Sequence, residues 1–477
     1  MVFSSLVFLY AFLPVCFICY GLSPRGYRSK SRTAIKNVIL TLFSLFFYAW
    51  GEPMYIFLML GSVFVNYFLG LGISGTKKTN HPGFSKFLFA IALLFNIGLL
   101  MVFKYSGFIV ENLNHIAGLS LPVPKLALPI GISFYTFQIL SYIIDLHWEK
   151  IEVQRNPLYL LLYISMFPQL IAGPIVRYST IEAEIHDRRV TLNDLSDGFT
   201  RLIIGLAKKV ILANHLSVIV DQFFKEGIGS LSVGATWYAV IVYAMQVYFD
   251  FSGYSDMAIG MGRMLGFHFD ENFRHPFLCK DISEFWQRWH ISLGTFFRDY
   301  LLYVPIFGRR SKYGGLFLVW FCTGLWHGAN WNFIIWGLYF GVFVCLEMMI
   351  GKKRMKKIPV VIKHIYSKIV IAVGFGIFYF EDFSKLGTFF KNLVGLNGNA
   401  LFDEVTALSM QNNLFLLIAA VICCFPVYDG IMKLREKYAG MGYAVGAFQV
   451  VSNAVLLVLS SILLVDATNN PFLYFRF

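Results

Sequence analysis

The sequence is short of charged residues. Only 14% of its 477 residues are Asp, Glu, Lys or Arg, whereas a soluble globular chain carries roughly 25%. Hydrophobic residues make up 57%. Length alone would allow about three soluble domains, but apolar runs near the ~20 residues that span a bilayer recur along almost the whole chain. The composition therefore excludes an ordinary soluble protein and predicts one polytopic membrane domain over residues 1–477.

Several motifs of common enzyme classes are also missing from the sequence. It contains no nucleophile elbow, P-loop or dinucleotide fingerprint, and no internal repeat, long linker or low-complexity tract. Its seven cysteines lie mostly inside apolar runs and predict no disulfide framework. Cys16 and Cys19 form a C-x-x-C pattern inside a predicted span, where we interpret them as packing residues rather than a redox or zinc site.

The positive charge is confined to short clusters. The net charge is +13, and Lys and Arg gather between apolar runs at residues 23–32, 76–78 and 351–357. Such clusters are typical of cytoplasmic loops that face anionic lipid, and they argue against a nucleic-acid partner. The N-terminal run lacks a basic leader and a small-residue cleavage site, so we expect an uncleaved first span whose N-terminus lies outside.

The apolar runs predict an all-α polytopic membrane protein of about eleven or twelve transmembrane helices, with interfacial and re-entrant helices in addition. The expected spans are residues 2–22, 36–50, 53–73, 87–110, 126–146, 157–173, 199–222, 233–262, 314–326 with 329–350, 361–380, 413–428 and 446–466. Residues 166–178, "MFPQLIAGPIVRY", contain two prolines and a glycine. Proline removes a backbone donor, so this stretch predicts a broken or re-entrant element.

A histidine lies between two apolar stretches in "CTGLWHGANWNF", residues 322–333. An imidazole there loses hydration, and an ionisable group inside a membrane is by default a functional-site hypothesis. The alternative is a hydrogen-bonded structural histidine. Trp326 and Trp331 would wall off His327. An H-x-x-x-H zinc spacing is absent around it, so we expect no metal.

A second histidine lies in "DISEFWQRWHISLGTFFRDYLLYVP", residues 281–305. Asp281 and Glu284 resemble a helix-starting cap, and Pro305 ends the helix. One apolar stripe recurs at three- and four-residue steps, at Ile282, Phe285, Trp286, Trp289, Leu293, Phe296, Phe297 and Tyr300. We predict an interfacial helix that presents His290, at the margin of the stripe, toward the protein. The alternative is an aromatic belt that happens to include a histidine.

The two histidines suit acyl transfer from a thioester. A hydroxyl that attacks a thioester needs a general base, and the developing oxyanion needs a donor. Burial keeps an imidazole neutral, so His327 suits the base. His290 or the Asn330 amide would polarise the acyl carbonyl or orient the acceptor. We expect Asn330, Trp326 and Trp289 to bind substrate.

These motifs resemble those of the membrane-bound O-acyltransferase family, in the bacterial branch that contains the alginate O-acetylation membrane protein. The resemblance runs nearly end to end, through the opening "MVFSSLVFLYAFLP", "LPIGISFYTFQILSYIID" (128–145), "FPQLIAGPIVRY" (167–178), "FDFSGYSDMAIG" (249–260), "FWQRWHISLGTFFRDYLLYVP" (285–305), "GLWHGANWNFIIWG" (324–337) and "NPFLYFRF" (470–477). It implies that His327 is the catalytic histidine and His290 the second active-site histidine. It also implies helices around a central pore or funnel, with donor and acceptor approaching from opposite faces.

The chain departs from the family pattern after the first Trp–His motif. Gly294 and Phe296 stand where relatives usually carry Ser and Trp, and the stretch that follows is about a residue longer and lacks paired glycines. These changes leave both histidines in place and concern the loop near the acceptor. Asp250, Asp256, Arg298 and Asp299 are expected to be buried ion-pair or hydrogen-bond partners rather than reacting groups.

The predicted function is transfer of an acyl group, expected to be acetyl, by a multi-pass enzyme of the bacterial cell membrane. The donor would be a cytoplasmic thioester, acetyl-CoA or an acyl-pantetheinyl carrier, with no bound cofactor. The acceptor would be an extracytoplasmic polysaccharide, such as an alginate-like exopolysaccharide or peptidoglycan, or an outward-facing partner transferase of the SGNH type that the resemblance implies. Two alternatives remain, D-alanyl transfer toward teichoic acid and, from another class, an ion-coupled transporter with broken helices and intramembrane Asp residues.

Overall fold

The computed structural model describes residues 1–23, 29–79, 81–171, 173–225, 227–304, 311–428, 430, 431, 433 and 442–465. Pro305 and the terminal motif 470–477 therefore lie outside the described residues. The chain divides into two compact units, Met1–Leu202 with Met257–Asp270 and Ile203–Asp256 with Glu271–Phe477. Each unit combines segments that are distant in the sequence.

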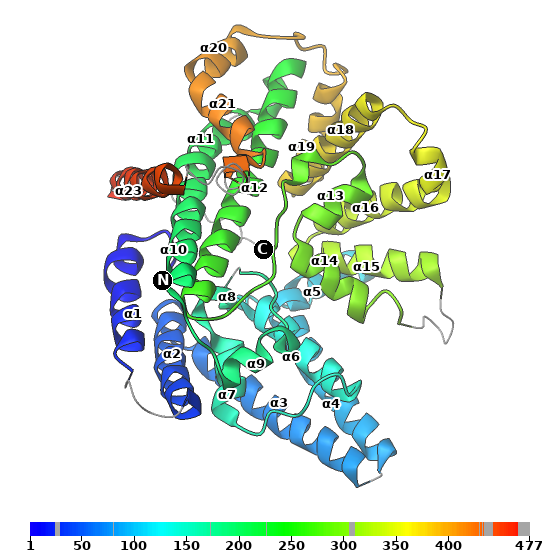
Figure 1. Ribbon diagram of the computed structural model, residues 1–477. Coiled ribbons are helices and arrows are strands. Elements are labelled where there is room, and N and C mark those ends of the chain that lie inside the picture. The colour runs from blue at the N-terminus through cyan, green and yellow to red at the C-terminus, as the bar shows by residue number, and fades with distance from the viewer. Residues whose placement is uncertain are drawn as a thin grey trace. The chain divides into compact units, whose positions relative to one another are not determined.

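The described residues form helices and connections without a strand (Figure 1). The first unit contains η1 Phe8–Phe12, α1 Leu13–Gly21, α2 Ser29–Gly51, α3 Tyr55–Lys78, α4 Pro82–Leu100, η2 Met101–Tyr105, α5 Ser106–Ala117, α6 Ile132–His147, α7 Pro157–Ser165, α8 Phe167–Leu170 and α9 Tyr178–His186. The unit boundary falls within two helices, α10 Leu192–Ala207 and α12 Val233–Met264.

The second unit carries both predicted active-site histidines. Its remaining helices are η3 Lys208–Ala213, α11 Asn214–Phe224, η4 Ile228–Ser230, η5 Pro276–Leu278, α13 Ile282–Arg288, α14 Ile291–Tyr300, α15 Lys312–His327, α16 Trp331–Ile350, α17 Lys352–Met355, α18 Val360–Tyr379, α19 Phe383–Leu393, α20 Glu404–Asn412, α21 Leu414–Cys423 and α23 Gly442–Val465. Helices α15 and α16 run side by side, and α16 packs on α18 (Figure 1).

Among the described residues, seven helices are long and apolar enough to cross a membrane, and the bent pair α20–α21 would make eight. The prediction of an all-α, multi-pass membrane protein is therefore confirmed. Several of the eleven or twelve expected spans are shorter or interrupted. The run 126–146 becomes helical only at Ile132, α15 has 16 residues, and 157–173 breaks at Met166.

The break at Met166 confirms the broken element that the prolines of residues 166–178 predict. α7 ends at Ser165, Pro168 lies in the first turn of the short α8, and residues 173–177 are not helical before α9 begins. The buried Gln169 amide donates a hydrogen bond back to the Tyr163 carbonyl. This bond satisfies a backbone group that the interrupted helix leaves without an intrahelical partner.

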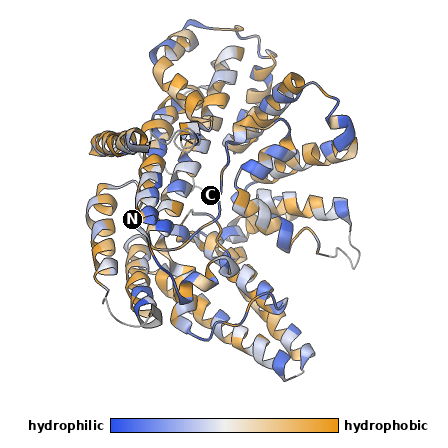
Figure 2. Ribbon diagram, in the orientation of Figure 1, coloured by the Kyte–Doolittle hydropathy of each residue, from blue (hydrophilic) through white to orange (hydrophobic). Residues whose placement is uncertain are grey.

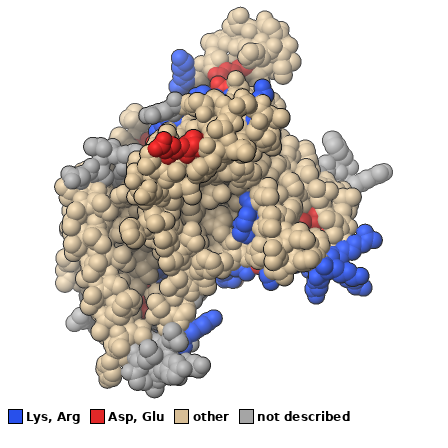
Figure 3. All heavy atoms as spheres, turned by 90° about the horizontal axis from the view of Figure 1, so that it is seen from above, with Lys and Arg blue, Asp and Glu red and all other residues tan. Residues whose placement is uncertain are grey.

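Many large apolar side chains are exposed on the spans. On α3, for example, Phe57 is 70% exposed and Phe64 is 64% exposed. In Figure 3 uncharged residues cover most of the face, and in Figure 2 the short basic helix α17 is hydrophilic. Such outward apolar faces are expected where helices contact lipid.

Buried polar groups hold the first unit together. The Arg188 guanidinium donates to Tyr20 Oη at 2.8 Å and to Asn37 Oδ1 at 2.6 Å, which joins it to α1 and α2. The amides of Asn66 on α3 and Asn96 on α4 donate to each other at 3.0 and 2.7 Å. Reciprocal amide bonds of this kind stabilise helix pairs in membranes, where lipid offers no competing partner.

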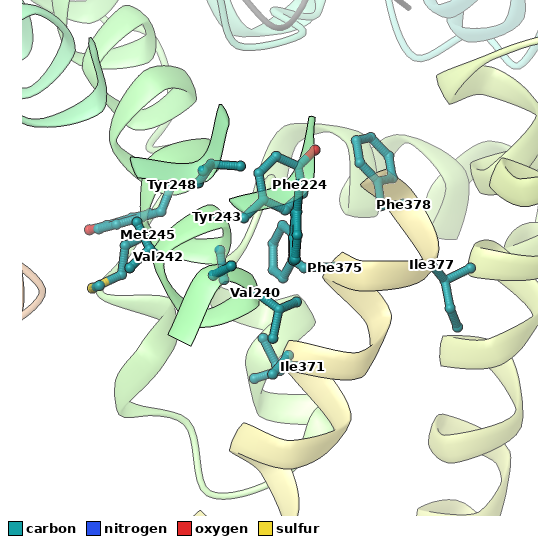
Figure 4. Packing of buried hydrophobic residues seen from close by; sticks show 14 of the residues in the cluster. Phe224, Val240, Val242, Tyr243, Met245, Tyr248, Ile371, Phe375, Ile377 and Phe378 are labelled. Atoms are coloured by element: carbon teal, nitrogen blue, oxygen red, sulfur yellow. The ribbon is translucent and has the colours of Figure 1, made fainter. Parts of the chain in front are cut away.

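The core of the second unit is rich in aromatic residues. Tyr243 on α12 packs edge-on against Phe375 and Tyr379 of α18, with ring centroids 6.1 and 4.9 Å apart. Figure 4 shows Tyr243 and Phe375 between these two helices. Edge-to-face contacts suit the ring quadrupoles and give aromatic cores a defined geometry.

Glycines bring α15 and α16 unusually close. A Cβ on Gly324 would lie 2.3 Å from the Phe333 carbonyl oxygen, and one on Gly337 would lie 2.4 Å from the Trp320 carbonyl oxygen. Both neighbours are backbone atoms and cannot turn aside. Small residues at such crossings let helix backbones approach each other in membranes. The glycines of "GLWHGANWNFIIWG" therefore position the helix that carries His327.

Replacing Gly324 by Ala is expected to destabilise the protein by about 1–3 kcal/mol, because α15 and α16 must move apart. Gly294 on α14 provides the matched control, since the nearest atom to its added Cβ is 3.8 Å away. Gly294→Ala should be neutral or stabilising by up to about 1 kcal/mol through helix propensity. Thermal unfolding of the detergent-purified variants measures both. Equal stability of the two variants would contradict the close-packing explanation.

Candidate active site

His327 is the last residue of α15 and is 7% exposed. Its ring packs against Trp326 and Trp336, with both centroid distances 4.8 Å, and against Phe378 at 5.2 Å. The chain turns away at Gly328, where a Cβ would lie 2.4 Å from the Phe333 ring. The site is therefore buried and aromatic. Trp336 and Phe378 contact the imidazole together with Trp326, and Trp331, which we expected to wall it off, is 46% exposed.

His290 is 1% exposed and lies between two helices, not within one. The expectation of one continuous helix from Asp281 was wrong, because α13 ends at Arg288 and His290 adopts the left-handed region with φ 44°. This conformation is uncommon for residues other than glycine and is found preferentially at functional sites. The predicted cap is confirmed: Asp281 Oδ1 accepts from the Glu284 N–H at 2.8 Å.

Hydrogen bonds to Asn272 explain why the helix is interrupted between α13 and α14. Its backbone oxygen accepts from the Ile291 N–H at 2.9 Å, and its Oδ1 accepts from the Ser292 N–H at 3.2 Å and the Ser292 hydroxyl at 2.9 Å. The first donors of α14 therefore bond to Asn272 instead of continuing α13. The predicted apolar stripe is nevertheless buried on both helices, apart from the partly buried Trp286.

Asn272 also sets the tautomer of His290. His290 Nδ1 lies 3.2 Å from Asn272 Oδ1. A backbone N–H can only donate, so the bond from Ser292 N identifies this atom as the amide oxygen. An oxygen that faces Nδ1 requires Nδ1 to carry the proton. His290 therefore has Nε2 as its lone-pair nitrogen in the neutral state.

The two histidines lie at opposite ends of their helices. Burial lowers the pKa of His290 from its usual value near 6.5 to about 3, so this imidazole is neutral at physiological pH. It precedes α14, whose positive N-terminal end also disfavours a positive charge. His327 ends α15, where the negative end of the helix dipole favours a positive charge. The two imidazoles therefore lie in opposite helix-dipole environments.

Trp326 joins the two histidines. Its indole is 4% exposed and contacts the His290 ring at 5.5 Å and the His327 ring at 4.8 Å. Phe251 of α12 also packs edge-on against His290, with ring centroids 4.6 Å apart. The structure thus brings His290, His327 and Trp326 together.

The other two predicted substrate-binding residues lie differently. Asn330 precedes α16, and its amide nitrogen is 3.5 Å from Glu381 Oε2. Trp289 is buried in the aromatic core, with ring centroids 5.2 Å from Phe273 and 5.4 Å from Phe375. A substrate role for Asn330 and Trp289 stays a prediction, and packing is the role that the geometry of Trp289 gives directly.

Two further buried polar residues position the site and were not singled out from the sequence. The Asn332 amide donates to the Phe378 carbonyl at 3.2 Å and holds the end of α18 against His327. Glu347 on α16 accepts from the N–H groups of Ile282 and Ser283 at 2.7 and 2.8 Å and so fixes the start of α13. Both are polar residues within an apolar run of the sequence, and this is the sequence signal that could have identified them.

The acidic residues of α12 form ion pairs, as predicted. Lys209 Nζ lies 2.6 Å from Asp250 Oδ1, and both side chains are less than 5% exposed. Lys208 pairs with Asp256 at 2.7 Å, with side chains 21% and 15% exposed. Arg298 pairs with its neighbour Asp299 at 2.7 Å, but on the surface. These carboxylates therefore have structural partners.

Replacing Asn272 by Leu is expected to lower any catalytic activity that depends on His290 roughly ten- to a hundredfold, the range found for residues that orient metal-ligating histidines. Leu cannot accept a hydrogen bond from the Nδ1–H group of His290, so the ring loses its fixed tautomer. Asn272→Asp should recover part of the activity, because a carboxylate oxygen accepts the same bonds. Its negative charge should also raise the pKa of His290, which adds an ionisation on the acid side of the pH–rate profile. Equal activity in both variants would contradict a positioning role.

Comparison with known proteins shows the family to which the chain belongs. Residues 132–381 match the model of the MBOAT, membrane-bound O-acyltransferase, family. The chain is 34% identical to the probable alginate O-acetylase of Pseudomonas putida over 498 aligned residues that cover the whole of both chains. It is 30% identical to the peptidoglycan O-acetyltransferase of Helicobacter pylori, covering 100% of this chain and 98% of the relative. It is also 30% identical to the teichoic acid D-alanyltransferase of Bacillus subtilis, over 60% of this chain and 75% of that protein. The chain therefore belongs to the membrane-bound O-acyltransferase family and is a multi-pass membrane enzyme of the O-acyltransferase class.

Proposed function

We propose that the enzyme transfers an acetyl group from a cytoplasmic thioester to hydroxyls of a polysaccharide on the outer side of a bacterial cell membrane. The observation that carries this proposal is the pair of buried imidazoles on either side of Trp326. The names of the relatives support a polysaccharide acceptor, since they refer to alginate, peptidoglycan and teichoic acid. Family membership supports acyl transfer over the ion-coupled transporter.

In this proposal His327 is the general base. It takes the proton of the acceptor hydroxyl as the oxygen attacks the thioester carbonyl carbon, and it returns the proton to the sulfur when the C–S bond breaks. The end of α15 favours the imidazolium that forms in between. The surrounding Trp336 and Phe378 rings exclude water, which would otherwise compete as acceptor.

His290 has the complementary role. Its Nδ1 proton is engaged by Asn272, so the neutral ring offers only the Nε2 lone pair. The reacting hydroxyl donates its single proton to His327, so this lone pair suits acceptance of a hydrogen bond from a neighbouring hydroxyl of the acceptor, rather than donation to the acyl carbonyl. Of the two roles expected for His290, orientation of the acceptor is therefore the one that the geometry supports.

The donor and the final acceptor complete the proposal. Acetyl-CoA and an acyl-pantetheinyl carrier present the same thioester arm, and either would serve as the donor substrate. The hydroxyl that enters the site belongs either to the glycan itself or to the serine of an extracytoplasmic SGNH-type partner that passes the acyl group on. D-alanyl transfer toward teichoic acid is the second candidate, favoured by the Bacillus subtilis relative.

The test compares cells that contain the protein with cells from which it has been deleted. Mild alkali releases ester-linked groups from the separated exopolysaccharide, peptidoglycan and teichoic acid fractions. The proposal predicts that acetate is lost from one of these fractions in the deletion and restored by complementation. Loss of D-alanine instead would establish the second candidate. Unchanged esters in all three fractions would contradict both.

A further inference from the structure

The second unit contains a cavity of about 430 Å³ that the proposed chemistry does not use. It lies between α12, α18 and the end of α21, and Figure 4 shows two of its lining residues, Met245 and Ile371. Its volume falls within the range of ligand pockets, roughly 300–1,000 Å³. Its wall is apolar apart from a few polar atoms, and among the described residues that line it Lys368 is the one that carries a charge.

The cavity opens toward the lipid-facing surface. The lining residues Ile241, Ile369, Val421 and Phe425 are each about half exposed. Two of them belong to α18 and to the bent α20–α21 pair, which are candidate membrane-spanning helices. Large apolar side chains that are exposed on a spanning helix face lipid chains. A hydrocarbon chain can therefore enter the cavity from the bilayer.

Lys368 is the cation that lines the cavity. It is eight residues after the start of the 20-residue α18, or about 12 Å along the helix, so its ammonium meets a phosphate by extending back toward the helix start, as long lysine side chains do in membranes. Its side chain leans back toward the start of the helix, which follows the exposed basic cluster of residues 351–357 that we expect at the cytoplasmic interface. The ammonium is held by the Cys279 carbonyl at 2.8 Å and the Ser367 hydroxyl at 3.1 Å. No carboxylate of the described residues lies within salt-bridge distance of it.

The cavity is separate from the two histidines. Phe277 of its wall packs on Trp289 at 6.4 Å, Trp289 on Phe273 at 5.2 Å, and Phe273 on His290 at 6.4 Å. The amides of a pantetheine arm would find few partners on this wall, because the Trp237 indole N–H already donates to the Leu393 carbonyl. The thioester donor is therefore a poor occupant, whereas a hydrocarbon chain is a good one.

We infer that this cavity binds one anionic phospholipid of the cytoplasmic leaflet, with an acyl chain between α12, α18 and α21 and its phosphate at Lys368. The acyl chain of the lipid covers the apolar wall of the cavity, and the lipid phosphate supplies the negative charge that faces the Lys368 ammonium. The site couples the enzyme to the lipid composition of its membrane and is independent of the acyl-transfer chemistry.

Native mass spectrometry of the detergent-purified full chain tests this inference, with dioleoyl phosphatidylglycerol and dioleoyl phosphatidylcholine as equimolar probes. The wild type should retain one phosphatidylglycerol about fivefold more strongly than phosphatidylcholine, which corresponds to about 1 kcal/mol for one lysine. Lys368→Met should abolish the preference but retain a lipid. Ala244→Phe, which fills the cavity, should reduce retention of both lipids. Lys363→Met, on the same helix outside the cavity, should behave as the wild type.

Three results would overturn the inference. They are equal retention of the two lipids by the wild type, a preference that survives Lys368→Met, and a preference that Lys363→Met also removes. Elution volume and melting temperature verify that each variant is folded. Lys368→Met changes a partly exposed side chain, so it tests the inference even if Ala244→Phe disturbs the packing of α12.

Discussion

Replacing His327 by Ala is expected to lower acyl transfer about a thousandfold. General bases contribute typically 10²- to 10⁴-fold, and His290 is a poor substitute because burial lowers its pKa to about 3 and so makes it a much weaker base. The change appears as a loss of ester-linked acetate from the cell surface at equal protein level. His327→Phe should be equally inactive while it preserves the packing against Trp326, Trp336 and Phe378.

His268 provides the matched control for this prediction. It is another histidine of the chain, its side chain is 56% exposed, and it pairs with Glu184 in the first unit. His268→Ala should leave acyl transfer within about twofold of the wild type, because a surface pair contributes little to stability. Full surface acetylation in the folded His327→Phe variant would exclude His327 as the base.

Replacing Lys209 by Met is expected to produce the largest loss of stability. Lys209 and Asp250 form an ion pair at 2.6 Å with both side chains buried, so the variant leaves the Asp250 carboxylate without this cation. Breaking one side of such a pair costs about 3–5 kcal/mol. The apparent melting temperature of the purified protein measures the loss. Asp250→Leu should destabilise the protein by a similar amount.

Two comparisons sharpen this prediction. The double variant Lys209→Met with Asp250→Leu removes both charges and should recover most of the stability, since replacing a buried pair by apolar residues is often neutral. Lys208→Met breaks the neighbouring pair with Asp256, which is more exposed, and should cost less. A double variant as unstable as Lys209→Met alone would contradict a simple ion pair and would indicate that one of the two side chains has another essential contact.

The sequence was sufficient where local chemistry decides the structure. The cap at Asp281, the buried stripe of α13 and α14, and the break between α7 and α8 all follow from spacing and from proline within a few residues. The two histidines were identifiable because an imidazole in an apolar run loses hydration unless it has partners. The same reasoning predicted that Asp250 and Asp256 would each have an ion-pair partner, since buried charges require partners.

The sequence was insufficient where distant residues decide. His290 lies at the margin of a good helical stripe, and nothing within that stripe predicts that the helix breaks beside it. The break depends on Asn272, 18 residues earlier, which takes the first N–H groups of α14. Likewise, Asn332 and Glu347 gain their roles only through contacts with α18 and α13. The number of spans is difficult for the same reason, because packing inside the protein allows short and interrupted helices that hydropathy cannot count.

The central claim is that His327 acts as the base on a thioester within this chain. The most direct measurement follows thiol release and label transfer from radiolabelled acetyl-CoA, and in parallel from an acetylated pantetheinyl carrier protein, by the purified protein in nanodiscs. We expect turnover of at least one donor by the wild type, its loss in His327→Ala, and a reduced rate in His290→Ala. Equal thioester turnover by the wild type and a folded His327→Ala variant would exclude His327 as the base.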